Sequence, residues 1–482
     1  MLFRSFGEGL ASQFANSAGF STISNNSGGQ QLANIPRYTG FYDVPFDSPL
    51  MPVSPAGGFP QTLPPGTMTQ ASSVDDGIRS PYSFEENLSV ARQLHGGFLV
   101  QASWVGRQSR RSLTGEDIAA PTDLVDPASG MDYFAAAKLM GTAVNAGQAS
   151  IAPIPFFENL WPGAAGGGKT ATENIFEQQY NTDPNDYTTP LLGIDASCSP
   201  SCSKLGQYSM FNSQYIANYA YRSIGMGDYN ALQLLVRKSF SQGYQFDFNY
   251  TLSKCMDLGS TPESSGAETS TGSILNTWNP SQMHAVCDYD LHHQITAFAV
   301  AELPFGKNKL LLADAGKVVN GVVGGWQLTS IFRDTTGYPG SIDNGVGYPT
   351  VWDFTGNATQ VGAIPGRSSN KGQLFSNQAA AYAAFSPTFA GQSGSRNVLR
   401  GDGLITWDAG LDKRFNLFSL HGHPNTLQFR FEGFNITNTA RIDIQSHNLA
   451  YGSKSSFGTA INGQNSQLVD PRVFQAALRY EF

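Results

Sequence analysis

The sequence has few charged residues and no long apolar run. Charged side chains make up 14% of its 482 residues, against roughly 25% in soluble domains. No run of about 18 apolar residues is present to form a spanning helix. The net charge of −8 argues against a nucleic-acid partner. The opening stretch from Met1 to Phe6 lacks a basic segment followed by an apolar core, so it does not read as a signal peptide.

Motifs for enzyme chemistry are also missing. The sequence contains no serine elbow, phosphate-binding loop or dinucleotide fingerprint. The pair His292-His293 and the pair His421 and His423 each lack a convincing third metal ligand. We therefore predict that the chain is not an enzyme and binds no cofactor and no metal.

The C-terminal residues alternate between apolar and polar side chains. One face of a strand would carry Phe474, Ala476, Leu478, Tyr480 and Phe482. The other face would carry Val473, Gln475, Ala477, Arg479 and Glu481. A period of two indicates a β-strand, and an apolar outside with a polar inside over about ten residues is typical of an outer-membrane barrel strand.

Nine spans of this kind follow one another along the chain. They are Phe84–Gln93, Phe98–Gly106, Leu232–Arg237, Tyr244–Lys254, Gln294–Leu303, Gly325–Asp334, Thr406–Phe415, Thr426–Thr437 and Phe474–Phe482. Each has about the length that a tilted membrane strand needs. An odd number leaves two edges unpaired in lipid, which is costly. Either the chain is incomplete or it contains a further strand, for which Gln214–Ile224 is the candidate.

The connections alternate between short and long, as in barrels with short periplasmic turns and long extracellular loops. The pattern predicts an all-β, antiparallel transmembrane β-barrel fold with a periplasmic C-terminus. Residues 1–80 form a loop-rich extracellular segment and residues 81–482 the barrel portion. The large loops are expected at about 107–228, 255–293, 335–405 and 438–471. The Gly, Pro, Ser and Asn content of residues 1–80 and 107–228 indicates loops with little core of their own.

All four cysteines fall in the predicted extracellular loops. In an oxidising compartment we expect two disulfides, Cys255–Cys287 and Cys198–Cys202. The alternative is a four-thiolate zinc site, although the spacing lacks paired Cys-x-x-Cys knuckles.

Charged side chains on the polar side of the strands are candidates for a lumen. By alternation they are Arg237, Asp247, Arg333, Asp408, Asp412, Arg430 and Glu432. They either line a path for a solute or neutralise one another inside the barrel.

Several stretches resemble the large Oar-like TonB-dependent outer-membrane receptors. They are Tyr229–Lys254, Glu302–Lys307, Gly325–Leu328, Phe429–Asn438 and Asp470–Arg472. The resemblance implies a barrel of about 22 strands, with an N-terminal plug energised through a TonB box. Neither part is identifiable here, so the chain is expected to be the C-terminal part of a longer protein. Ligands in this family range over metal chelates, glycans and peptides, so the resemblance names no substrate.

The expected function is uptake of an unidentified solute across the cell outer membrane. A surface adhesion or interaction protein that uses a barrel as its anchor is the alternative, and a soluble secreted β-sandwich is a third. The expected partners are outer-membrane lipid and the barrel-assembly machinery, with the TonB system acting only through a missing plug. The signal for that machinery is predicted at Phe474, Leu478, Tyr480 and Phe482.

Overall fold

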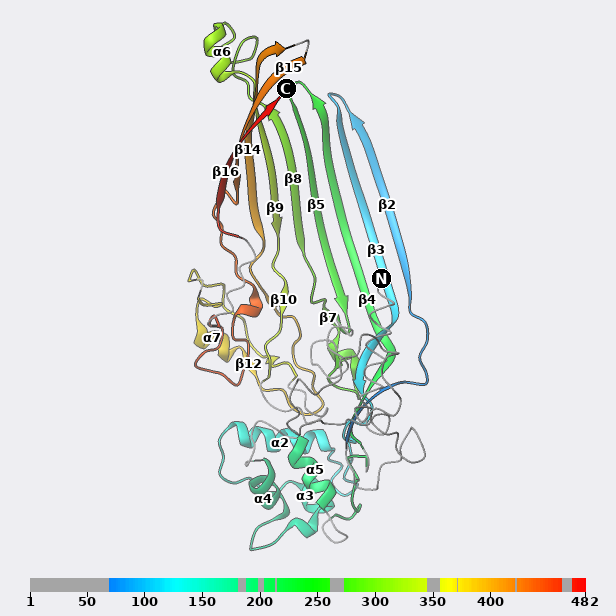
Figure 1. Cartoon of the computed structure of the whole chain (residues 1–482). Coiled ribbons are helices and arrows are strands. Elements are labelled where there is room, and N and C mark those ends of the chain that lie inside the picture. Colours follow the sequence, from blue (N-terminus) through cyan, green and yellow to red (C-terminus); the bar gives the residue numbers. More distant parts are fainter. Residues whose placement is uncertain are drawn as a thin grey trace, which may run out of the picture.

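Nine long strands form a curved wall in the computed structural model (Figure 1). The structure describes residues 69–180, 188–197, 203–212, 215–260, 273–344, 356–370, 372–420, 423–461 and 470–482. The wall strands are β2 Tyr82–Leu94, β3 Phe98–Asp117, β4 Tyr215–Ser241, β5 Tyr244–Asp257, β8 His293–Glu302, β9 Trp326–Thr335, β14 Ile405–Leu420, β15 His423–Phe434 and β16 Val473–Glu481. They match the nine spans that alternation predicts.

Each wall strand pairs antiparallel with the next wall strand in the chain. Short turns join β2 to β3 and β4 to β5, where Gly96, Gly97, Gln242 and Gly243 have positive φ. Such turns match the right-handed twist of the strands that they join. The long connections 118–214, 258–292, 336–404 and 435–472 all lie at the other end of the wall.

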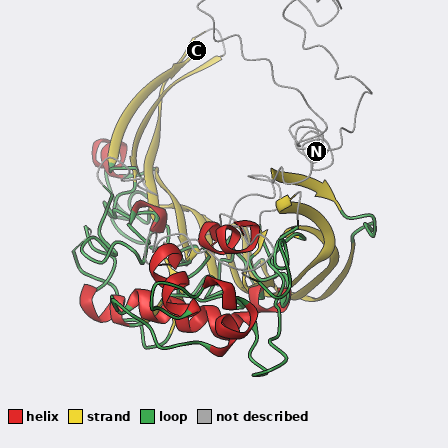
Figure 2. Cartoon of the chain, turned by 90° about the horizontal axis from the view of Figure 1, so that it is seen from below, coloured by secondary structure: helices red, strands yellow, loops and turns green. Residues whose placement is uncertain are grey.

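The described wall is an arc with two open edges. Its strand order runs from β16 to β2 without a pairing between these two strands. Figure 2, seen from the long-connection end, shows the strands curving around an open centre. The antiparallel sheet is therefore present, but a closed barrel is not seen in the described part of the chain.

The predicted extra strand is the first part of β4. Residues 215–224 continue directly into 225–241 as one strand. The register with β3 shifts between Arg110 and Thr114, opposite Gly225, and such bulges move side chains to the other face. A Cβ on Gly225 would lie 2.6 Å from the Ser112 carbonyl oxygen, so the close strand approach needs glycine here. The prediction of a separate strand over Gln214–Ile224 was wrong because the bulge inverts the alternation.

The extended ends of β3 and β4 continue the same sheet beyond the wall. There β1 Thr69–Val74 pairs parallel with β4, β6 Ser273–Ile274 pairs parallel with β3, and β7 Ala285–Val286 pairs with β5. A buried cluster that includes Tyr219 and Ile274 lies beside it. The loop expected over 107–228 is therefore shorter than predicted. Of the segment 1–80, residues 1–68 lie outside the described chain.

A helical module fills the connection between β3 and β4. Its helices are α2 Tyr133–Asn145, α3 Pro155–Leu160, α4 Ala171–Ile175 and α5 Thr188–Ser197. Asp132 caps α2, and Thr170 with Glu173 forms a capping box on α4. Phe156 and Trp161 are fully buried in its core, where each such side chain contributes about 1.5–3 kcal/mol. The expectation of a loop without its own core was wrong here.

A second folded layer comes from the connections before β14 and before β16. It contains α7 Gln378–Ala383 and the short strands β10 Pro339–Gly340, β11 Thr359–Gln360, β12 Phe385–Ser386 and β13 Leu399–Arg400. Phe375, Phe385 and Phe457 pack together in its core. None of the described helices is long and apolar enough to cross a membrane.

Candidate functional site

The strand register divides the wall into two chemically different faces. Across the wall, Val236 lies opposite Phe248, Phe248 opposite Ala297, and Ala297 opposite Phe332. Farther along, Leu411 lies opposite Phe431, which lies opposite Ala476. We call this side the apolar face and the other side the polar face. Paired residues on neighbouring strands share a face.

The register places all seven lumen candidates on the polar face. They are Arg237, Asp247, Arg333, Asp408, Asp412, Arg430 and Glu432. The four candidates of the assembly signal belong to the other side: Phe474, Leu478 and Tyr480 pair with apolar-face residues, and Phe482 follows by alternation. Leu478 and Phe474 are exposed.

Most of the polar-face charges have a partner of opposite charge. Arg237 Nε lies 2.8 Å from Asp247 Oδ1. Arg430 pairs with Glu432 and lies 4.0 Å from Asp412. Pairs this exposed contribute little to stability, so their main effect is to keep the polar face balanced in charge.

The other two candidates have different surroundings. Asp408 accepts a hydrogen bond of 2.8 Å from the backbone of Asn435, so it holds the chain where β15 ends. Arg333 lies opposite Thr296 and Thr406. The polar face therefore combines structural carboxylates with side chains that can meet a solute.

A hollow of about 640 Å³ lies on the polar face near the long connections. Glu85, Arg107, Tyr229 and Cys255 form one row across β2, β3, β4 and β5, and all four line the hollow. Arg107 Nε lies 3.3 Å from Glu85 Oε1, and both side chains are exposed. A guanidinium, a carboxylate and an aromatic ring in one hollow can bind a polar solute by hydrogen bonding and stacking.

The loop between β5 and β8 adds Tyr289 to the hollow. Partial desolvation raises the pKa of Tyr289, which is still 57% exposed, and the charges of Asp257 and Asp288 raise it further. Its phenol therefore stays neutral at ordinary pH and can donate a hydrogen bond.

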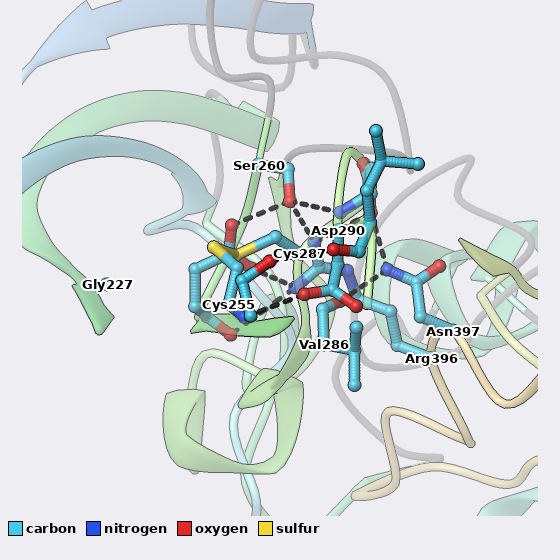
Figure 3. Close-up of a disulfide and its surroundings, with 12 residues drawn as sticks. Gly227, Cys255, Ser260, Val286, Cys287, Asp290, Arg396 and Asn397 are labelled. Carbon is cyan, nitrogen blue, oxygen red and sulfur yellow. Dashed lines mark hydrogen bonds and ion pairs between the residues drawn. A yellow bond between two sulfur atoms is a disulfide. The ribbon is translucent and has the colours of Figure 1, made fainter. Parts of the chain in front are cut away.

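A disulfide fixes the same loop. Cys255 and Cys287 are bonded, with their Cα atoms 5.4 Å apart, which is the pairing expected from the sequence (Figure 3). The backbone N–H of Cys287 donates to the Cys255 carbonyl at 3.1 Å, and that of Cys255 donates to Asp290 at 2.7 Å. The expected partners Cys198 and Cys202 lie outside the described residues.

A buried arginine connects this loop to the connection before β14. Arg396 Nη1 lies 2.7 Å from Asp257, and Nη2 lies 2.8 Å from Asp288 and 2.6 Å from the Ser260 hydroxyl. Figure 3 shows Arg396 next to the disulfide. Although burial alone lowers the pKa of Arg396, the carboxylates of Asp257 and Asp288 raise it above its ordinary value. We call Arg396, Asp257, Asp288 and Ser260 the Arg396 cluster. It fixes the loop that carries Tyr289.

The histidines have local partners. His292 Nδ1 lies 2.8 Å from the Ser253 carbonyl and His293 Nδ1 lies 2.9 Å from the Tyr250 hydroxyl. Within the described ranges, no group of three or more His, Cys, Asp or Glu side chains is placed to hold a metal ion. The side chain of His423 and the whole of His421 lie outside the described part.

Sequence reasoning singled out Cys255 as a disulfide candidate but missed Glu85, Arg107 and Tyr289 of the hollow. Glu85 and Arg107 occupy polar positions of the first hairpin. Alternation could have placed them on the polar face, as it did for the charged residues of the later strands. Tyr289 and Arg396 lie in connections without periodicity, so their sequence neighbours carry no comparable signal.

The comparison with protein families agrees with a membrane wall. The family model described as outer membrane beta barrel domain matches residues 1–475. The search of curated proteins finds no match.

Two solved structures align with the chain. The outer membrane transporter YddB from Escherichia coli aligns at 7% identity with a TM-score of 0.34, over 86% of this chain and 34% of that one. The siderophore receptor PiuA from Acinetobacter baumannii aligns at 9% identity with a TM-score of 0.16, over 83% of this chain and 56% of that one. The chain therefore spans less than two thirds of either protein. Scores this low carry no argument about this molecule.

Proposed function

Because the chain belongs to the outer membrane beta barrel domain family, we propose that it forms part of the wall of a transporter that takes up a solute. The observation that carries this proposal is the division of the wall into two faces. The apolar face suits lipid, and the polar face with its hollow suits a water-filled path. The protein is then a non-enzymatic transporter or receptor.

The open edges support a wall completed by further strands. Nine antiparallel strands leave β2 and β16 running in the same direction. An all-antiparallel closure therefore needs an odd number of additional strands between them. Unpaired backbone groups in lipid cost several kcal/mol each, so the proposed barrel is larger than the described arc. The resemblance to Oar-like receptors suggests a plug and TonB-driven transport, with these strands in the same chain.

We propose that the short-turn end faces the periplasm. Barrels of this class have short periplasmic turns and long extracellular loops, and β16 ends at the short-turn end. The hollow, the disulfide and the helical module would then lie toward the outside of the cell. There the solute arrives, and disulfides persist. The barrel-assembly machinery would read the apolar side chains of β16.

Solute depletion from the growth medium tests the transport proposal. Cells that produce the full-length protein and cells that lack it are compared by mass spectrometry of the spent medium. A solute depleted only by the producing cells is then retested with Arg107→Ala and Tyr289→Ala. Each change removes a contact of about 1 kcal/mol or more, so uptake at low concentration should fall about fivefold or more per variant.

The control is Lys454→Ala in the connection before β16, which should leave uptake unchanged. Identical media from producing and lacking cells would reject transport.

The helical module favours the alternative of a surface interaction protein. Its own buried core is more structure than a solute gate needs. Binding of producing cells to host or bacterial surfaces, abolished by removal of residues 123–211 and without any solute depletion, would select this second function.

A further inference from the structure

The connection between β8 and β9 is a compact turn, residues 303–325, which we call the β8–β9 turn. The backbone N–H of Leu311 donates to the Pro304 carbonyl at 2.8 Å, and that of Lys307 donates to Asn320 Oδ1 at 2.6 Å. Gly306 has a φ of +116°, and a Cβ there would lie 2.8 Å from Gly324 Cα. The turn includes helix α6, Lys317–Val323. These contacts give it a defined structure.

This ordered turn exposes apolar side chains. The exposed fractions are 86% for Leu310, 81% for Val318, 64% for Val322, 53% for Leu312 and 49% for Val319. Helix α6 has no buried residue. Exposed apolar side chains gathered on one ordered turn indicate a contact with a protein or a membrane.

The turn is attached to the apolar face of the wall. Lys413 Nζ donates to the carbonyls of Gly321 and Val322 at 2.6 and 2.9 Å. Trp326 Nε1 donates to the Val322 carbonyl at 2.9 Å. Lys413 and Trp326 lie opposite each other in the β9–β14 register, on the apolar face. The exposed side chains of the turn are therefore continuous with the surface proposed to meet lipid, at the end where Figure 1 shows α6.

Two lysines lie at this end of the apolar face, and both side chains are buried against neighbouring rings. Lys413 Nζ lies 4.8 Å from the centre of the Phe415 ring. Lys238, on the same face of β4, lies 4.1 Å from the centre of the Tyr244 ring and donates to the Ser241 hydroxyl at 2.7 Å. Lysines and aromatic rings of this kind gather where acyl chains meet headgroups.

The turn also carries the charge that suits headgroups. Lys307 and Lys317 are exposed, and Lys309 lies 2.6 Å from Glu302 at the start of the turn. Apolar side chains beside lysines on one short segment are the pattern of an interfacial membrane anchor.

We propose that the β8–β9 turn is such an anchor and lies in the phospholipid headgroup region of the periplasmic leaflet. Leu310, Val318 and Val322 enter the acyl boundary, while Lys307 and Lys317 meet lipid phosphates. The anchor rests on the proposed membrane placement of the wall and adds a lipid-binding surface to it. It fixes the depth of the wall on the side where the short turns leave little protein outside the membrane.

Photocrosslinking in intact cells tests the anchor. A diazirine amino acid replaces Leu310 or Val318 in the full-length protein, cells are irradiated, and adducts on the purified protein are identified by mass spectrometry. Leu478 on the apolar face is the positive control and Ala477 on the polar face the negative control. We expect phospholipid adducts at positions 310 and 318, at a yield within about threefold of that at position 478.

Other results overturn the proposal. Lipopolysaccharide adducts would place the turn in the outer leaflet, and protein adducts would make it a docking surface for a partner. An absence of lipid at 310 and 318 with labelling at 478 rejects the anchor alone. An absence at all three positions rejects the membrane placement of the wall and the anchor with it.

The charge variant Lys307→Gln with Lys317→Gln isolates the headgroup contact. The share of anionic phospholipid among the adducts at position 318 should fall about threefold or more. The matched variant Lys138→Gln with Lys169→Gln, in the helical module, should leave that share unchanged. An unchanged share in the first variant overturns the role of the two lysines.

Discussion

Arg396 and Asp257 form a buried ion pair although 139 residues separate them in the chain. Their side chains are 4% and 6% exposed, and Nη1 lies 2.7 Å from Oδ1. One partner belongs to the connection before β14 and the other to the end of β5. The pair therefore ties the connection before β14 to the end of β5.

Replacement of the arginine should loosen both connections. In Arg396→Met the carboxylate of Asp257 stays buried without its cation, which costs about 3–5 kcal/mol. Hydrogen exchange in residues 273–292 and 388–400 should accelerate, while exchange in the wall strands should not. The control is Arg367→Met, which removes the more exposed Arg367–Asp402 pair. If hydrogen exchange in residues 273–292 and 388–400 accelerated equally in both variants, the Arg396 cluster would stabilise these connections no more than the Arg367–Asp402 pair does.

Loss of the disulfide should act on the same loop. Cys255→Ser with Cys287→Ser frees a loop whose ends are 32 residues apart, and the chain-entropy model gives a loss of about 2–4 kcal/mol. Cleavage between residues 258 and 292 by an added protease should become faster, with the rest of the pattern unchanged. Unchanged cleavage would show that the Arg396 cluster alone orders this loop.

The two faces of β16 should respond oppositely to a charge. Leu478→Lys places an ammonium group on the apolar face, at a cost of about 2–4 kcal/mol near the bilayer midplane. Ala477→Lys, one residue away, places the same group on the polar face. We expect a reduced outer-membrane yield for the first variant and normal yield for the second, measured by heat-modifiable mobility. Equal yields would contradict the assignment of the faces.

The layer around His447 should weaken in acid. Burial lowers the pKa of His447, and the charge of Arg367 lowers it further, so folding favours the neutral ring. Its stabilising contribution is full above the unfolded pKa near 6.5 and is lost as the pH falls through the lowered folded value. Exchange in residues 435–461 should rise between pH 7 and pH 5, after correction for intrinsic rates. In His447→Gln the increase in exchange between pH 7 and pH 5 should be smaller. An increase equal to that of the unaltered protein would show that other groups cause it.

The wall strands were predictable because a sheet with one apolar and one polar face imposes alternation on each strand. Tyr244–Ser253 shows it without interruption, and each of the nine predicted spans corresponds to a strand or part of one. The alternation failed at Gly225, where a bulge exchanges the faces. The alternation of one strand's sequence does not reveal this register shift, because the shift is defined by the pairing with β3.

The site was less predictable than the wall. Arg237 and Asp247 lie in strands, so the alternation of side chains predicted that both lie on the polar face. Arg396 and Tyr289 act through contacts between connections, which no local pattern encodes. The helical module was missed although Asp132 and the Thr170–Glu173 capping box are helix-start signals, because the Gly and Ser content of the whole stretch outweighed them.

Accessibility along β5 tests the central claim most directly. A nitroxide on an introduced ketone-bearing amino acid is placed at each position from Gln245 to Leu252 in the full-length protein, in outer membranes. Collisions with oxygen, which concentrates in lipid, and with a water-soluble nickel chelate are measured at each site. We predict oxygen maxima at Phe246, Phe248, Tyr250 and Leu252, and nickel maxima at Gln245, Asp247, Asn249 and Thr251. The same accessibility at all eight positions, or the opposite alternation, would contradict a wall with lipid on its apolar face and a water-filled path on its polar face.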